Sequence, residues 1–263
     1  MDILKRSLAP VTEEAWDEIL ETSKEVFNKV LSARKFIDVD GPKGMDFPGI
    51  SLGRLDIPGN QKDPVNYGIH QFQPMVETRA MFKLNIWELD NINRGAEDID
   101  FDALEGAAMK IGEFEENAIY NGFSKGNIKG LKNSSEHKTL KYPDDPGGVM
   151  KVLSEGVATF TNSYIEGPYS LVVGKDRWQD IMSYHNGYPL KKQITNLIEG
   201  KIIYSPHLKE SYLVSERGGD FRLTLGGDLS IGYDSHDTKN VQLFFTESFT
   251  FQVIDPAAVI VIK

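Results

Sequence analysis

Residues 226–237, GGDLSIGYDSHD, combine glycines with aspartates and a histidine, a composition found in metal-binding and phosphate-binding loops. An EF-hand calcium loop needs oxygen ligands at alternate positions and a glutamate at the twelfth, and the residues after Asp228 do not supply them. A Walker loop ends in Gly-Lys-Ser/Thr, which this sequence lacks. Calcium repeats of glycine and aspartate require iteration, and this stretch occurs once. We therefore interpret it as turns between two strands at 221–225 and 241–245.

Other residue types that carry catalysis are missing or unsuitably spaced. The histidines form no HxxxH or HExxH pair, so we expect no histidine metal site. The acidic run at 113–117, EFEEN, lacks the Glu-x-x-His of di-iron bundles and is interpreted as a solvent-exposed helix face. We expect no serine nucleophile elbow, and the chain has no cysteine for a nucleophile, a zinc site or a disulfide. The sequence predicts a protein that is not an enzyme and holds no metal or cofactor of its own.

Trp87 lies next to Glu88 in a stretch, residues 79–89, whose alternating apolar residues predict a strand. We interpret Trp87 as a core aromatic residue. The alternative is a surface tryptophan on which a planar ligand such as a flavin stacks.

The composition describes a globular protein with a substantial core. The chain has 263 residues, 40% hydrophobic and 26% charged, which fits one large domain or two modest ones. Its net charge of -10 argues against nucleic-acid binding, because that requires lysine and arginine to neutralise phosphates. The N-terminal residues lack the apolar segment of a signal peptide, and no apolar run approaches the ~20 residues of a membrane span. We expect a soluble, cytoplasmic protein with no nucleic-acid or membrane partner.

Two long amphipathic helices are predicted, at 12–31 and 101–120. Thr12 is a good N-cap, and the glutamates at 13 and 14 suit the positive end of the helix dipole. Apolar residues then recur at helical spacing on one face of each segment. The first apolar stripe is long enough for part of it to receive a partner.

Residues 41–74 change character, with frequent glycine and proline between short alternating stretches. This pattern predicts a two-stranded excursion outside the core. Because long loops in compact domains are uncommon unless they have a function, we expect an arm that reaches a neighbouring subunit.

The rest of the chain mixes short helices with strands and predicts an α+β fold. A domain boundary is expected near 143–148. Helices are predicted at 149–160, 178–182 and 194–198, strands at 165–174 and 201–205, a polar loop at 183–189, and hairpin strands from 212 onward.

Sequence blocks spread along the chain form a recognisable set. They are LKRSLAPVTEEAW, ARKFIDVDGPKG, WELDNINRG, IEGPYSLVVG, SERGGDFRLTLGGDLSIGYDSHD and FTESFTFQVIDP. The blocks span residues 4–256 in order, and together they resemble type 1 encapsulin shell proteins. The resemblance implies the fold of tailed-phage major capsid proteins. It also implies an icosahedral shell, of sixty subunits in the smaller type, that encloses a cargo enzyme.

The resemblance implies a division into domains. Residues 1–40, 75–130 and 223–263 would form a peripheral domain that includes the N-terminal helix. Residues 41–74 would be the extended loop that pairs with a neighbouring subunit, and 131–222 would be the axial domain at the fivefold vertex. The cargo of such shells is commonly a ferritin-like iron oxidase, which serves iron storage and oxidative-stress defence, or a dye-decolourising peroxidase.

In this family a groove on the lumen side binds a short C-terminal docking peptide of the cargo. Carried over to this sequence, the groove would be formed by Phe27, Val30, Leu31, Arg34, Asp38, Leu229, Ile231 and Tyr233. The apolar side chains would bury the hydrophobic anchors of the peptide, while Arg34 and Asp38 would fix its direction.

The polar loop SYHNGYP aligns with the fivefold pore loop of the family, so His185, Asn186, Gly187 and Tyr188 would ring a channel for small ions. Fivefold symmetry would repeat each side chain, and a ring of histidines changes its charge near neutral pH. The alternative is an ordinary surface turn.

Two other functions stay open at this point. A viral major capsid protein shares the fold, but the chain begins directly with the shell helix, so we expect no scaffold segment or processed N-terminal segment. Its acidic balance also suits packaged DNA poorly. An enzyme would need a catalytic constellation, which the sequence does not supply.

Overall fold

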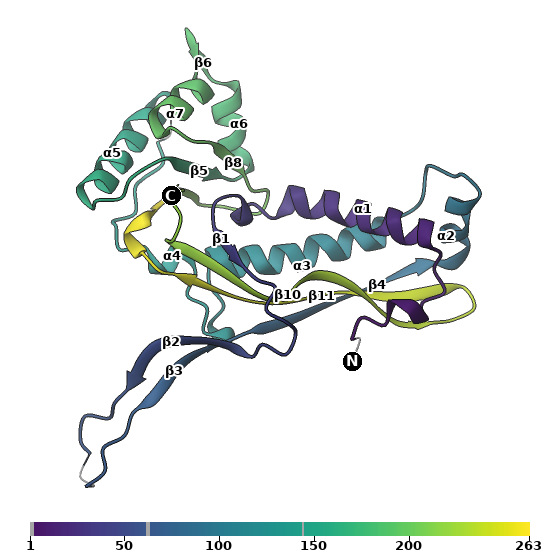
Figure 1. Cartoon of the computed structure of the whole chain (residues 1–263). Helices are drawn as coiled ribbons and strands as arrows, with labels where there is room; N and C mark the ends of the chain where they lie inside the picture. Colours follow the sequence, from purple (N-terminus) through teal and green to yellow (C-terminus); the bar gives the residue numbers. More distant parts are fainter. Residues whose placement is uncertain (1–2, 62–63, 144) are drawn as a thin grey trace.

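A computed structural model describes residues 3–61, 64–143 and 145–263 (Figure 1). The α-helices are α1 (Glu13–Val30), α2 (Ile86–Asn93), α3 (Asp102–Tyr120), α4 (Leu131–Ser134), α5 (Val149–Asn162), α6 (Lys175–Ser183) and α7 (Leu190–Ile198). The strands are β1 (Asp38–Asp40), β2 (Gly49–Asp56), β3 (Ile69–Pro74), β4 (Val76–Asn85), β5 (Tyr169–Val173), β6 (His185–Asn186), β7 (Tyr188–Pro189), β8 (Ile202–Tyr204), β9 (Ser211–Ser215), β10 (Phe221–His236), β11 (Asn240–Val253) and β12 (Val259–Ile262). Short 3-10 helices include η1 (Arg6–Leu8), η2 (Ala33–Lys35) and η5 (Pro256–Ala258). This mixture of helices and sheets confirms the predicted α+β class.

The first sheet, of order β1-β10-β11-β4, carries α1 and α3 side by side on one face (Figure 1). β1 pairs in parallel with the start of β10, and β10 and β11 form a long antiparallel hairpin. The core between helices and sheet contains Ile19, Leu104, Leu243 and Phe245, all fully buried. Because each such side chain contributes about 1.5–3 kcal/mol when it is buried, these contacts hold both helices on the sheet.

Local signals set the start of α1. The Thr12 hydroxyl accepts a hydrogen bond from the Ala15 amide at 3.3 Å, as an N-cap does. Glutamates fill the first turn, where the helix dipole is positive. The helices predicted at 12–31 and 101–120 are both confirmed, within one residue at each end. None of the helices in the described part of the chain combines length with enough apolarity to cross a membrane.

The second sheet, of order β12-β9-β5-β8, lies with α5, α6 and α7 in a separate layer (Figure 1). β5 is buried along its whole length, as expected for a strand covered on both faces. β12 comes from the end of the chain and pairs with β9. The sheet therefore crosses the predicted limit between the segments 131–222 and 223–263. The helix predicted at 194–198 begins earlier, at Leu190.

β2 and β3 form the predicted two-stranded arm, which projects away from both sheets (Figure 1). The arm leaves Leu55, Ile57, Tyr67 and Ile69 exposed. Residues 62–63, which belong to the predicted arm, lie outside the described residues. The contact of this arm with a neighbouring subunit stays a prediction.

β10 contains residues 226–236 of the glycine-rich stretch that we interpreted as turns, so that interpretation is wrong. Glycine also occurs in strands where a neighbouring group approaches closely. A Cβ on Gly227 would lie 2.0 Å from Met45 Sδ, and one on Gly232 would lie 2.2 Å from the Phe244 ring. The turn of the hairpin follows, between β10 and β11.

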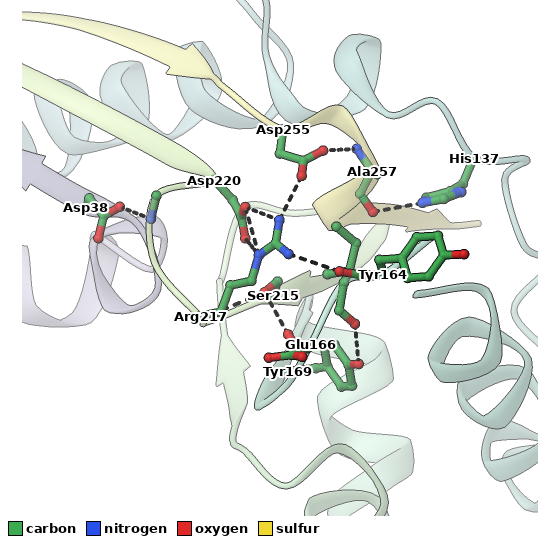
Figure 2. Close-up of polar contacts among 12 residues, drawn as sticks. Asp38, His137, Tyr164, Glu166, Tyr169, Ser215, Arg217, Asp220, Asp255 and Ala257 are labelled. Carbon is green, nitrogen blue, oxygen red and sulfur yellow. Dashed lines mark hydrogen bonds and ion pairs between the residues drawn. The ribbon is translucent and has the colours of Figure 1, made fainter. Parts of the chain in front are cut away.

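Arg217 links segments at the junction of the two sheets (Figure 2). Its guanidinium donates to both carboxylate oxygens of Asp220 and, at 2.7 Å, to Asp255. It also donates to the Tyr164 carbonyl at 3.2 Å. Asp220 is buried, and this bidentate pairing offsets its desolvation. The network fastens the chain between β9 and β10 to the segments that follow α5 and β11.

Candidate functional site: a groove between α1 and β10

A groove of about 480 Å³ opens between α1 and β10. Leu20, Phe27 and Leu31 of the α1 side face Leu229 and Ile231 of β10. The remaining lining residues are Phe245 and the polar or charged Arg6, Ser23, Lys24, Asn28, Arg34, Lys35, Asp228 and Ser230. Apolar side chains on both walls, interspersed with charged and polar ones, suit a site that binds an amphipathic segment in a defined orientation.

Aromatic contacts hold the apolar walls on the sheet. Phe27 meets Phe245 edge to face at a centroid distance of 5.4 Å, and Phe245 stacks on Phe82 at 4.9 Å. Such pairs contribute about 0.5–1.5 kcal/mol each beyond the burial of their area. The groove is therefore built on the rigid core and not on a loop.

The segment before α1 lies along β10 and contributes Arg6 to the groove. The Tyr233 amide donates to the Leu4 carbonyl at 2.7 Å, and Arg6 Nε donates to the Ile231 carbonyl at 2.7 Å. The Arg6 guanidinium also lies 5.5 Å from the centroid of the Trp16 ring. Arg6 was not predictable from the sequence as a groove residue, because no periodic signal in this segment places it beside β10.

Arg34 lies at the groove within a cluster of carboxylates from α3, β11 and β10. Nε donates to Glu115 Oε1 at 2.9 Å, Nη2 to Glu247 Oε1 at 2.6 Å, and Nη1 to Asp228 Oδ1 at 2.9 Å. The side chains of Glu115 and Glu247 are fully buried, whereas that of Asp228 is 50% exposed. Burial works against the charge of Arg34, but the hydrogen bonds and charges of these carboxylates outweigh it and raise the Arg34 pKa.

Glu116 lies beside this cluster and fastens the chain that follows α1. Its carboxylate accepts hydrogen bonds from the Ser32 hydroxyl, from the Ala33 amide at 2.8 Å, and from the Ser205 hydroxyl at 3.4 Å. Burial raises the pKa of Glu116 to about 7, although the hydrogen bonds from Ser32 and Ala33 act in the opposite direction. The carboxyl group therefore titrates near neutral pH.

The burial of Glu115 and Glu116 contradicts our interpretation of residues 113–117 as a solvent-exposed face. Carboxylates are tolerated in a protein interior when they are paired or hydrogen-bonded. Here Arg34 and the chain just before it, residues 32–33, supply those partners.

The structure brings together most, but not all, of the residues predicted to form the groove. Those on its walls are Phe27, Leu31, Arg34, Leu229 and Ile231. Val30 is buried in the core below, and Tyr233 contacts His236 Nδ1 through its hydroxyl at 2.7 Å. Asp38 accepts a hydrogen bond from the Gly219 amide at 2.6 Å, at the start of β1. The geometry therefore gives Asp38 a structural partner away from the groove walls.

The predicted polar loop at 183–189 is a small hairpin at the tip of the second layer (Figure 1). His185 pairs with Pro189 and Asn186 with Tyr188, while Gly187 adopts a φ of 74° that favours glycine. His185 and Tyr188 are exposed. A channel would be a property of assembled copies, so the pore role of this hairpin stays a prediction.

Trp87 lies in α2, not in a strand, and is 72% exposed. Our interpretation of a core aromatic residue within a strand at 79–89 is wrong, because β4 ends at Asn85. The Asn85 side chain caps α2 by accepting hydrogen bonds from the amides of Trp87 and Glu88.

The hollow beside Trp87 combines an exposed indole with charged side chains. The indole could stack on a planar ring, but Glu88, Asp100 and Asp102 line the hollow with Lys83. These carboxylates would repel the phosphate of a flavin nucleotide. Flavin binding at Trp87 stays a prediction.

Residues 49–53, GISLG, have the Gly-x-Ser-x-Gly spacing of a serine nucleophile, although we expected no such elbow. They lie in β2 of the arm, where Ser51 Oγ accepts a hydrogen bond from the Gly53 amide at 3.3 Å. A nucleophile elbow requires a turn from strand to helix, so the spacing does not build one here. Among the described residues, no three histidine, aspartate or glutamate side chains are grouped to hold a metal ion.

The two layers and the projecting arm define a capsid-like fold. The structure is similar to that of a virus-like particle from Pyrococcus furiosus, with a TM-score of 0.68 over 94% of this chain and 98% of that one, at 15% identity. It is also similar to the Mycobacterium phage Che8 structure, with a TM-score of 0.54 over 84% and 85% of the chains, at 11% identity. At such identities the likeness shows the fold alone, and it confirms the predicted phage-capsid-like fold.

Sequence comparison then places the chain in a particular family. A family model described as an encapsulating protein for peroxidase matches residues 1–250. Type 1 encapsulin shell proteins from Mycolicibacterium paratuberculosis and Rhodococcus erythropolis are each 36% identical, covering 95% and 99% of this chain and the same shares of their own. The chain belongs to the encapsulin shell protein family, which confirms the resemblance drawn from its sequence blocks.

Proposed function

We propose that copies of this protein enclose a cargo enzyme and hold it by a short apolar peptide bound in the groove between α1 and β10. The observation that carries the proposal is the groove itself, which has apolar side chains on both walls and is preformed on the sheet core. Burying the anchors of a peptide there would contribute roughly 25 cal/mol per Å² of apolar area. A cargo peptide that lies in extended form along β10 would bind by one of the recurring modes in which proteins recognise peptides.

Charged groups at the margin would set the direction of the peptide. Lys24 and Lys35 lie on the side of α1 and η2, and Asp228 lies opposite them on β10, while Arg6 contacts the Ile231 carbonyl further along β10. This opposition gives a bound peptide a preferred orientation, because complementary charges fix register more than they add affinity. Arg34 would act through Asp228, and Asp38 has no part in this arrangement.

Substituting aspartate for apolar residues of the groove, the exposed Leu20 and the half-buried Leu229, tests the proposal. Leu20→Asp and Leu229→Asp should leave shells assembled but lower the amount of co-purifying cargo about tenfold, because each places a charge against the apolar anchors. Met109→Asp is the matched control, since Met109 is exposed on α3 and does not line the groove. Cargo loading that equals the control in both groove variants would contradict the proposal.

Two classes of enzyme are candidates for the cargo. We infer a ferritin-like iron oxidase, which would give the shell a role in iron storage and oxidative-stress defence. A dye-decolourising peroxidase is the second candidate, and the description of the matching family model, an encapsulating protein for peroxidase, favours it. Mass spectrometry of shells from the native host distinguishes the two, because it identifies the co-purifying protein by its peptides.

We further propose a closed icosahedral shell of sixty subunits in which each arm covers a neighbour. The exposed apolar side chains of the arm, among them Ile57 and Ile69, support this arrangement. A viral capsid would be built on the same fold, but the likeness to phage proteins is one of fold alone. Native mass measurement of the particles would test the copy number.

A further inference from the structure

Glu115 and Glu247 are fully buried, and neither lines the groove, yet both bind the residue that does. Glu115 receives Nε and Nη2 of Arg34 in a bidentate pair, at 2.9 and 2.5 Å. Glu247 receives Nη2 at 2.6 Å. Because Nε and Nη2 bind these two carboxylates, Nη1 points toward Asp228 on the groove wall and lies 2.9 Å from its Oδ1. The fixed fork of a guanidinium transmits orientation in a way that a flexible ammonium does not.

The wall formed by β10 needs such support, because its ladder is interrupted at this point. The pairing with β11 passes from Gly227 opposite Ser248 to Ser230 opposite Thr246, with register shifts on the way. Asp228 and Leu229 therefore have no register partner across the hairpin. Irregular pairing of this kind re-aims side chains and loosens a strand locally.

Asp228 replaces the missing ladder contacts with side-chain ones. Its Oδ1 accepts a hydrogen bond from the Leu229 amide at 2.8 Å as well as from Arg34. Its carbonyl accepts one from the Ser230 hydroxyl at 2.8 Å. The ion pair with Arg34 thus reaches the backbone of the residues that form the wall.

We propose that Glu115 and Glu247 are positioning residues of the groove. They hold the Arg34 guanidinium so that it clamps Asp228 and keeps residues 228–231 of β10 in the binding conformation. The consequence for cargo rests on the proposed function of the groove, whereas the clamp itself does not. A peptide that meets a fixed wall loses less conformational freedom on binding than one that must order it.

The charge balance of the cluster gives the clamp a dependence on pH. The charged groups that face one another are Arg34 from η2, Glu115 from α3, Glu247 from β11 and Asp228 from β10, with Glu116 of α3 adjacent. Burial, and then the charge of Glu115, raise the pKa of Glu247 well above its usual range. Glu247 therefore keeps its proton to a higher pH than an ordinary carboxyl group does. When Glu247 loses this proton at higher pH, its buried carboxylate gains a negative charge. That charge repels the carboxylate of Asp228, the exposed member of the cluster.

A reporter on the wall tests the clamp without any ligand. The chain has no cysteine, so Ser230→Cys gives a unique site for a nitroxide spin label in assembled shells. Glu115→Gln and Asp228→Asn should both make the label mobile near neutral pH. Asp228→Asn changes an exposed side chain, so it keeps the test valid if the buried variant assembles poorly. Glu210→Gln, which removes the carboxylate of a remote pair with Lys132, is the control and should leave the label immobile.

The pH profile separates positioning from a general structural role. The parent should lose label immobility as pH rises, and Glu247→Gln should flatten that profile, because its amide has no proton to lose. Identical profiles in the parent and Glu247→Gln, or identical spectra in Glu115→Gln and the Glu210→Gln control, would overturn the inference.

A peptide-binding measurement distinguishes failure of the clamp from failure of the proposed function. The probe is a fluorescein-labelled hexapeptide of alternating leucine and serine, titrated into shells without the spin label. Its Kd should rise about tenfold in Glu115→Gln relative to the Glu210→Gln control. A mobile label with an unchanged Kd would uphold the clamp and contradict the groove as the peptide site. An immobile label would overturn the clamp whatever the Kd.

Discussion

Hydrogen bonds of Glu116 connect the segment where α1 passes into η2 with the residue that follows β8. Ser32 and Ala33 precede and begin η2, and Ser205 follows β8 of the second sheet. The Tyr120 hydroxyl shares a hydrogen bond of 2.8 Å with Ser32. One carboxyl group therefore joins the first layer to the second, and its protonation state affects both.

Replacing Glu116 with glutamine should flatten the dependence of stability on pH. The pKa of Glu116 is about 7 in the folded chain against an ordinary value of 4.5, so the folded state binds more protons between these values. Its stabilising contribution is fully present below the ordinary value and is lost as pH rises through the folded one, by up to ~3 kcal/mol. Thermal unfolding of shells from acid to mildly alkaline pH measures this. Equal slopes for Glu116→Gln and the parent would contradict the assignment.

Helical spacing already contained the signal that Glu115 is buried. Glu115 lies four residues after Ile111 and three before Ala118, both of which are buried on the core side of α3. The charge of the acidic run led to the opposite interpretation, since the sequence does not reveal that Arg34, 81 residues earlier, folds back to pair with it. In the same way, Leu20 lies seven residues before Phe27, and Lys24 lies seven residues before Leu31. This spacing places them on the same helix face, so both were predictable as groove residues.

The hairpin β6–β7 is the element in which a single side chain would act through symmetry. His185→Asp should leave assembly intact, because His185 is exposed at the tip, and should raise the rate of cation entry several-fold by adding a ring of negative charge. His236→Asp, exposed at the end of β10, is the charge-matched control. Stopped-flow quenching of a fluorophore inside the shell by a divalent cation measures entry. Entry at the same rate in both variants would argue against a pore at this hairpin.

Elements with a strong period were predictable, and elements set by close approach were not. α1, α3 and the arm followed from apolar spacing and from glycine and proline content. β10 was misread because Gly227 makes room for Met45 and does not form a turn. α2 was missed although Asn85 and Glu88 stand at N-cap and third-residue spacing, because the alternating pattern before them continues to residue 89.

At the scale of the whole molecule, substitutions in the arm distinguish folding of the subunit from assembly of the shell. Ile57→Asp and Ile69→Asp should leave the circular dichroism of the subunit unchanged, because both side chains are already exposed, and should prevent shell formation. Met109→Asp serves as the control for a charge on another exposed apolar position. Size-exclusion chromatography distinguishes shells from single subunits. Full shells from both arm variants would show that the arm does not make the contact.

Sequence blocks were sufficient to predict the family and the capsid-like fold, because these depend on the whole chain. The limits of the layers were less predictable. β12 resembles any short apolar strand, and its partner β9 lies more than forty residues earlier in the chain. Strand partners at such separations depend on the tertiary fold and not on the local pattern. For the same reason the place of Asp38 beside Gly219 did not follow from its position after α1.

We propose that copies of this chain form a shell and that the shell holds a cargo protein. The most direct measurement is electron microscopy of the untagged protein from its native host, with mass spectrometry of the same particles. We predict closed, uniform shells that contain a second protein, ferritin-like or a peroxidase. Monomers or small oligomers that persist across salt and protein concentration would contradict the account.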